Sequence, residues 1–159
     1  MRHALLAPFP ELASIAGPWL EHSIGGRPSH GIPPHVTVLA PSPDDIGPAL
    51  DGFASFDVTF RETRRFENAV YLAPEPEEPF IAMTKAVWAR FPDWPPYGGE
   101  FLPDITPHLT IAWGAKLDEA EAAVASRLPI RTRAREVVLF ARMESERWVP
   151  KMRFPLVDA

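Results

Sequence analysis

Two short segments of the chain carry the same pattern of residues. Residues 34–38 read PHVTV and residues 107–111 read PHLTI, so proline, histidine, an apolar residue, threonine and a β-branched residue occur twice in that order. Two accidental His-x-Thr segments are expected in roughly one or two sequences of this composition in a hundred. We therefore interpret the two segments as one functional motif that is present twice.

Each motif predicts the start of a β-strand. Proline is tolerated at the first position of a strand, and it favours extended geometry in the residue before it. Side chains two positions apart point to the same face of a strand, so His35 lies beside Thr37 and His108 lies beside Thr110. The apolar residues between and after them point to the other face. Each motif thus places an imidazole and a hydroxyl together, with core residues behind them.

Twenty prolines fall in clusters that separate the expected elements. Runs rich in Val, Ile, Leu, Thr and Phe predict strands over residues 3–7, 35–40, 56–65, 69–73, 108–113, 131–141 and 148–156. Apolar spacing and helix-forming residues predict helices over residues 11–22, 44–52, 78–91 and 117–128. The chain therefore alternates strands and helices along its whole length.

The order of these elements repeats when the sequence is shifted by 73 residues, the separation of the two histidines (108 − 35). After each motif strand come a helix, a long strand and a further strand. Neighbouring strands with short connections favour antiparallel pairing. We expect an α+β fold: a single domain over residues 1–159, built of two pseudo-symmetric lobes. Each lobe would hold a mostly antiparallel sheet with packed helices, and the two would meet at a central groove.

The overall charge limits the class of partner. The formal net charge is −5 and the sequence pI is about 5.5, so the molecule lacks the basic field that draws in long nucleic acid. There are no cysteines, which excludes disulfides, thiolate metal sites and a cysteine nucleophile. Prolines interrupt the apolar N-terminus, and no apolar run approaches the length of a membrane span. We expect a cytoplasmic monomer.

Two imidazoles and two hydroxyls, delivered to one groove, suit the cleavage of a phosphodiester. In-line displacement at phosphorus needs a base for the attacking oxygen and an acid for the leaving oxygen. Histidines can do both near neutral pH, because their unperturbed pKa is about 6.5. The threonines can hydrogen-bond the non-bridging oxygens. This chemistry requires no metal ion and no other cofactor.

The paired HVTV and HLTI segments resemble the signature of the 2H phosphoesterase superfamily, which includes the 2'-5' RNA ligases and the cyclic nucleotide phosphodiesterases. The resemblance extends over nearly the whole chain, and its specific content is the two motifs and the element order around them. It implies metal-independent chemistry on 2',3'-cyclic or 2',5'-linked phosphates in a bilobal α+β fold. It also implies that His35 and His108 are the acid–base pair and that Thr37 and Thr110 anchor the phosphate.

One difference from that family bears on the substrate. Some RNA-ligating relatives carry a basic residue in the strand just past the second motif, where this sequence has Trp113. Together with the acidic charge, this favours small cyclic phosphates, nucleotides or RNA ends over a tRNA-sized partner. Tyr97 and Phe101 lie in the loop before the second motif, where an aromatic ring can stack on a base or simply pack on the surface.

Two alternatives use other features of the sequence. A metal-dependent hydrolase could use His3, His22 and His30, although no carboxylates accompany them at ligand-like spacings. A non-catalytic module could hold an RNA end or nucleotide on the same scaffold. Separately, Arg27 in a glycine-containing loop could contact a phosphate or simply be an exposed arginine.

Overall fold

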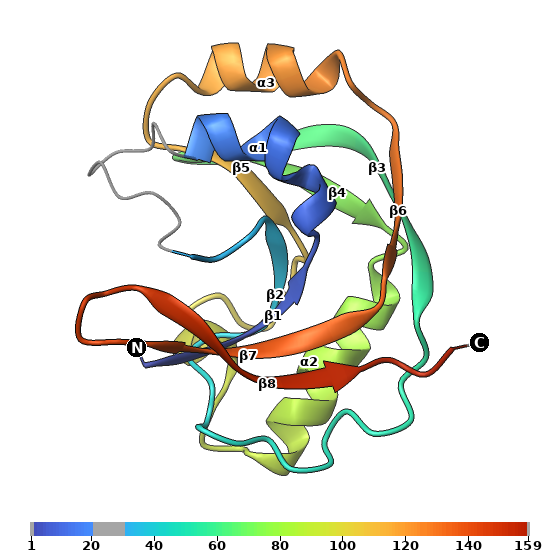
Figure 1. Cartoon of the computed structure of the whole chain (residues 1–159), viewed down its shortest axis with the longest axis vertical. Coiled ribbons are helices and arrows are strands. Elements are labelled where there is room, and N and C mark those ends of the chain that lie inside the picture. The colour runs from blue at the N-terminus through green and yellow to red at the C-terminus, as the bar shows by residue number, and fades with distance from the viewer. Residues whose placement is uncertain (1, 21–30, 159) are drawn as a thin grey trace.

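The described residues form one curled antiparallel sheet of eight strands (Figure 1). The computed structural model describes residues 2–20 and 31–158. The strands are β1 (His3–Pro8), β2 (His35–Leu39), β3 (Phe56–Phe66), β4 (Ala69–Glu75), β5 (Leu109–Trp113), β6 (Ile130–Ala134), β7 (Glu136–Arg142) and β8 (Trp148–Pro155). Their order in the sheet is β6-β3-β4-β5-β2-β1-β7-β8. The predicted α+β class with antiparallel pairing is confirmed.

The two motif strands, β2 and β5, are the central neighbours of this sheet. In the described part of the chain they are joined by one ladder pair, Val36 with Leu109. The predicted division into two sheets is therefore wrong, because the backbones of the motif strands pair with each other across the middle. Four strands lie on each side of this junction, so the sheet still has two halves.

The chain moves between these halves more often than its sequence order suggests. Strands β3 and β4 follow the first motif but lie beside β5, in the half of the second motif. The single strand predicted over residues 131–141 is wrong, because Arg135 separates β6, which pairs with β3, from β7, which pairs with β1 and β8. This segment crosses from one half of the sheet to the other.

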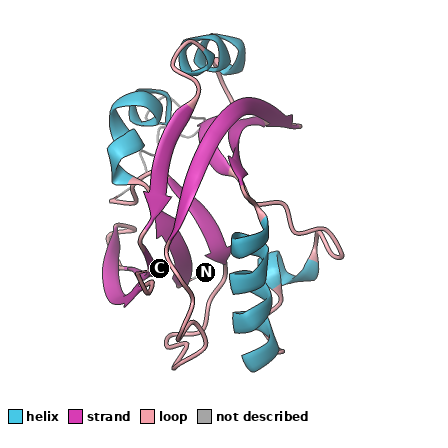
Figure 2. Cartoon of the chain, turned by 90° about the vertical axis from the view of Figure 1, so that its right-hand side faces the viewer, coloured by secondary structure: helices cyan, strands magenta, loops and turns pink. Residues whose placement is uncertain are grey.

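In the part of the chain that the structure describes, three α-helices cover the sheet: α1 (Ala13–Leu20), α2 (Glu78–Arg90) and α3 (Leu117–Ala125). A short 3-10 turn, η1 (Pro10–Leu12), precedes α1. Helices α1 and α3 lie at one end of the sheet and α2 at the other (Figures 1 and 2). The last two residues of the predicted helix 11–22 fall outside the described residues. Within the described chain, no helix has both the length and the apolar character needed to cross a membrane.

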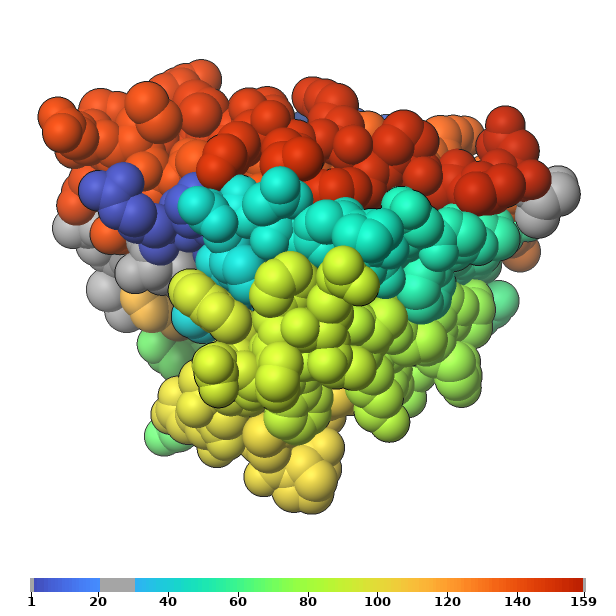
Figure 3. Space-filling model, turned by 90° about the horizontal axis from the view of Figure 1, so that it is seen from below, coloured from blue at the N-terminus to red at the C-terminus, as the bar shows by residue number. Residues whose placement is uncertain are grey.

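The helix predicted over residues 44–52 is wrong, because this segment forms a series of turns. Gly47 and Gly52 have positive φ, and Pro48 has no backbone N–H to donate. The carboxylate of Asp45 accepts the Gly47 N–H at 2.8 Å, which offers the backbone a local alternative to a helix. The turns lie between α2 and the C-terminal strands (Figure 3).

Each of the first two helices packs against the motif strand of the other half. Helix α1 connects β1 with β2 but packs mainly on β5, and α2 connects β4 with β5 but packs on β2. The buried hydroxyl of Thr84 on α2 donates to the Val38 carbonyl of β2 at 2.6 Å. Phe80 of α2 also meets Phe9 in the core, with ring centroids 6.4 Å apart. Both motif strands are thus backed by a helix and by buried apolar residues.

Candidate active site

Both histidines are oriented in the same way, by a preceding proline and a hydrogen bond from the ring to a backbone carbonyl. Pro34 and Pro107 precede them, are themselves buried, and favour extended backbone in the residue before. In each motif the imidazole Nδ1 hydrogen-bonds the carbonyl oxygen two residues earlier. His35 bonds the Pro33 carbonyl at 2.9 Å and His108 bonds the Thr106 carbonyl at 2.7 Å.

These hydrogen bonds assign the tautomer of each ring. A carbonyl oxygen only accepts, so Nδ1 carries the proton and donates it. The other nitrogen, Nε2, has no hydrogen-bond partner among the residues that the structure describes, in either His35 or His108. Each neutral ring thus has one fixed nitrogen and one nitrogen that can accept a proton from a ligand or, once protonated, return it.

The ladder pair between β2 and β5 brings the two motifs to one face of the sheet. Val36 and Leu109 lie opposite each other and are fully buried. Their sequence neighbours therefore point to the other face, where His35, Thr37, His108 and Thr110 are all half-buried. His108 itself lies one residue before β5, rather than within the strand as predicted. One backbone pairing thus gathers two imidazoles and two hydroxyls.

The surroundings make both imidazoles harder to protonate. Burial lowers the pKa of His35 below the ordinary 6.5; the bond to the Pro33 carbonyl opposes this, and the charge of His108 lowers the pKa further. Burial also lowers the pKa of His108, against the opposing effect of the Thr106 carbonyl. Because a charged His108 disfavours a charge on His35, the pair favours states in which at most one ring is protonated.

Aromatic side chains surround His108. The ring of Phe66 lies 4.9 Å from it edge-on, and that of Tyr71 lies 5.6 Å away. Tyr97 lies nearly parallel to the imidazole at 6.4 Å, and Phe101 lies 5.8 Å from Tyr97. These rings exclude water from one side of His108, which accounts for the burial that lowers its pKa.

The loop that carries Tyr97 is held close to the first motif. Tyr97 lies in the 3-10 segment η2 (Pro96–Gly99) with a left-handed backbone, φ 51°, an uncommon conformation for a residue with a side chain. Its N–H donates to the Ala40 carbonyl at 2.8 Å. Burial raises the pKa of Tyr97, and the nearby Thr37 side chain opposes that shift.

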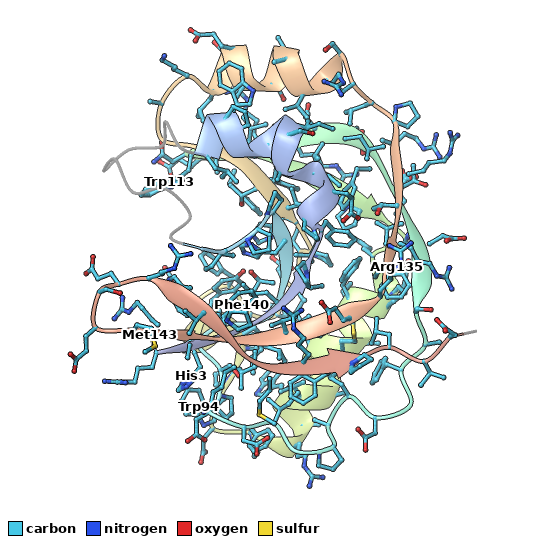
Figure 4. All side chains as sticks on the ribbon, viewed as in Figure 1. His3, Trp94, Trp113, Arg135, Phe140 and Met143 are labelled. Atoms are coloured by element: carbon cyan, nitrogen blue, oxygen red, sulfur yellow. The ribbon has the colours of Figure 1, made fainter. Side chains whose placement is uncertain are left out.

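A cleft of about 830 Å³ opens beside His108. Of the predicted site residues, Thr37, His108, Thr110, Tyr97 and Phe101 line it, whereas His35 lies outside its lining. The cleft also contains residues that sequence reasoning did not assign to the site, including Phe66, Trp113, Glu67, Glu100 and Asp104. In Figure 4, Trp113 lies at the left of the view and Arg135 at the right.

The residues of the alternative proposals are only partly placed. His22, His30 and Arg27 lie outside the described residues, and His3 belongs to β1 and does not line the cleft. Among residues 2–20 and 31–158, no group of three or more His, Cys, Asp or Glu side chains is arranged to hold a metal ion.

A family model and several solved structures are similar to this chain. A family model described as the 2'-5' RNA ligase superfamily matches residues 8–146, and no curated protein matches the chain. Among solved structures, E. coli LigT complexed with 3'-AMP is similar with a TM-score of 0.62, 15% identity and coverage of 98% of this chain and 97% of that one. E. coli LigT complexed with NADP+ has a TM-score of 0.61 and 19% identity, with coverage of 98% of this chain and 97% of that one. The protein TT0787 of Thermus thermophilus has a TM-score of 0.62 and 17% identity, with coverage of 98% of each chain. At these identities the structural likeness concerns the fold.

Proposed function

Because the chain belongs to the 2'-5' RNA ligase superfamily of 2H phosphoesterases, as the resemblance of its motifs predicts, we propose that it is a metal-independent phosphoesterase. Its substrates would be 2',3'-cyclic phosphodiesters or 2',5' linkages, in nucleotides or RNA ends. The observation that carries this proposal is the Val36–Leu109 pair, which directs two histidines and two threonines to one face. In the described part of the chain, both histidines there have an unpaired Nε2.

In the proposed reaction a water molecule attacks phosphorus while one ribose oxygen leaves. One histidine accepts the water proton at Nε2, and the other donates a proton from Nε2 to the departing ribose oxygen. One P–O bond forms and one breaks, so a cyclic phosphodiester becomes a phosphomonoester with a free hydroxyl. After each turnover the first ring releases its extra proton to solvent, and the second ring takes up a proton from solvent. His35 and His108 take these two roles.

Thr37 and Thr110 stabilise the phosphate in this proposal. Their hydroxyls donate to the non-bridging oxygens, where negative charge redistributes as the attacking oxygen approaches. Thr37 and Thr110 both line the cleft beside His108, which supports this role.

The aromatic residues of the cleft supply the contact with a nucleobase. Tyr97 and Phe101 line the cleft from η2 and the loop after it, and Phe66 and Trp113 line it from the last positions of β3 and β5. Every base offers a flat face for stacking on such rings. E. coli LigT has been solved with 3'-AMP, ATP and NADP+, which supports a nucleotide-sized ligand for this chain.

We propose that residues 1–159 act as one domain of two pseudo-symmetric lobes, as a cytoplasmic monomer without a cofactor.

The first test is turnover without metal. A nucleoside 2',3'-cyclic phosphate, incubated with the protein in excess EDTA, should be opened to a phosphomonoester, because imidazoles alone supply the acid and the base. Chromatography or phosphorus NMR would follow the product. Binding without opening would favour the non-catalytic module, and activity that EDTA removes and added metal restores would favour the metal-dependent hydrolase.

The pH dependence provides a second prediction. The kcat/KM value should follow a bell-shaped profile, since one histidine must be neutral and the other protonated. Burial lowers the pKa of both rings, so both limbs should shift to lower pH and the maximum should lie below pH 6.5. A maximum well above that value would contradict the roles given to these two groups.

The Phe66→Ala variant would assign one limb of the pH profile to His108. Removing the ring 4.9 Å from His108 admits water, so the pKa of His108 should rise toward 6.5, and histidine NMR titration would measure that rise. The limb that moves with it belongs mainly to His108. Trp94→Ala, another exposed aromatic that does not line the cleft, is the matched control and should leave both limbs in place.

A further inference from the structure

The cleft beside His108 is lined by aromatic side chains together with aliphatic residues and prolines. Four of its aromatic side chains are substantially exposed: Phe66 at 42%, Tyr97 at 38%, Phe101 at 58% and Trp113 at 47%. The ring centroids of Phe66 and Tyr97 lie 4.9 Å and 6.4 Å from that of His108. Aromatic surface therefore continues from the proposed reacting centre into the cleft. Such a surface suits a planar group attached to the phosphate.

The charged part of the same lining is negative. Glu67 follows Phe66 in the turn between β3 and β4, and Glu100 and Asp104 lie in the loop after η2. All three are exposed, and none has a hydrogen-bond or ion-pair partner for its carboxylate in the described part of the chain. No lysine or arginine is among the described residues that line the cleft. The charges of these carboxylates are thus not neutralised by a neighbouring cation there.

Aromatic rings next to carboxylates that are not neutralised should favour ligands with one phosphate over ligands with more. The reacting phosphodiester has a single negative charge and binds at the histidines and threonines. A terminal phosphomonoester would add a charge of about −1.5 to −2 near neutral pH. A cleft of about 830 Å³ is comparable in width with the Debye length of ~10 Å at 0.1 M salt. A second phosphate on a nucleoside bound there would therefore feel the carboxylates.

We propose that the cleft is a subsite for an uncharged nucleoside, and that Glu67, Glu100 and Asp104 select against substrates bearing a further phosphate. The preferred substrate class is a nucleoside 2',3'-cyclic phosphate with a free 5'-hydroxyl, and its 5'-phosphorylated counterpart is disfavoured. This inference rests on the proposed function for the identity of the reacting group. It adds the specificity of the site and the residues that set it.

The expected discrimination is moderate and depends on salt. Unit charges several ångströms apart interact weakly in water, but three carboxylates act together on a group of nearly double charge, which gives about a tenfold preference at low salt. Ions screen exposed charges, so the preference should shrink as the salt concentration approaches 1 M. A steric preference would not respond to salt in this way.

The experiment compares two substrates that differ only in the 5'-phosphate. The kcat/KM value is measured for each at low and at high salt, with the wild-type protein and with the triple variant Glu67→Gln, Glu100→Gln, Asp104→Asn. The wild type should prefer the 5'-hydroxyl substrate about tenfold at low salt, and the triple variant should lose that preference, mainly through a lower KM for the phosphorylated substrate. Glu144→Gln removes one exposed charge in the turn between β7 and β8 and should retain the preference.

A binding measurement separates this inference from the proposed function. Calorimetry with a nucleoside 2'-monophosphate and the matching 2',5'-bisphosphate requires no turnover, so it tests charge selection even in a protein that opens neither cyclic substrate. Weaker binding of the bisphosphate that disappears in the triple variant supports the proposal. Equal binding of the two ligands by the wild type, or a preference that survives in the triple variant, overturns it.

Discussion

Replacing His108 with alanine should lower kcat/KM for a nucleoside 2',3'-cyclic phosphate by about 10²- to 10⁴-fold, and His35→Ala should cost a similar factor. Each substitution removes the Nε2 that moves a proton, and no described residue offers a second titratable nitrogen at the same place. The double variant should lose little more than either single one, because the two rings act in one concerted displacement.

The control for these variants is His3→Ala. His3 is a half-buried strand histidine, like His35, but it lies on β1 and belongs to neither motif, so activity should remain close to that of the wild type. Circular dichroism and the Tm would show whether each variant is folded. A folded His35→Ala or His108→Ala protein that retains turnover within a few-fold of the wild type would refute the two-histidine mechanism.

The threonines should have the second-largest effect. Thr110→Val keeps the volume of the side chain but removes the hydroxyl, and we expect kcat to fall about 10²-fold while KM changes less, because the bond strengthens as charge develops. Thr37→Val should act similarly. Steady-state kinetics on a cyclic nucleotide would separate the two parameters.

Thr59 provides the matched substitution for these variants. It is a half-buried strand threonine on β3 whose side chain has no hydrogen bond to any described residue, and it does not line the cleft. Thr59→Val should therefore leave kcat unchanged. If Thr110→Val also left kcat unchanged, the phosphate would have to be held by other donors, and the role given to the second motif would need revision.

Local patterns predicted the elements better than their arrangement. The helix predicted over residues 78–91 is confirmed as α2, because its buried residues recur at helical spacing and Pro79 suits its first turn. The predicted helix 44–52 fails because positive φ at Gly47 and Gly52 was not visible from composition. Arg135 looks like part of a strand in the sequence, and only the pairing of β6 and β7 with different partners reveals the crossing.

The candidate site was predictable where it depends on spacing within a strand and unpredictable where it depends on neighbours in the sheet. The motifs alone predict that each histidine shares a face with a threonine. Phe66 and Glu67 reach the cleft because β4 pairs with β5, with Ala69 opposite Trp113. That register follows from long-range pairing, for which the sequence contains no local signal.

The exchange of helices between the halves makes the protein indivisible. Helix α1 supports the strand of the second motif and α2 supports the strand of the first, so a fragment containing one motif would lack the cover of its own motif strand. The smallest version that could work from a single motif would be a pair of identical copies, each lending a helix to the other. A single chain that holds both motifs always supplies both covering helices and does not depend on an encounter between copies.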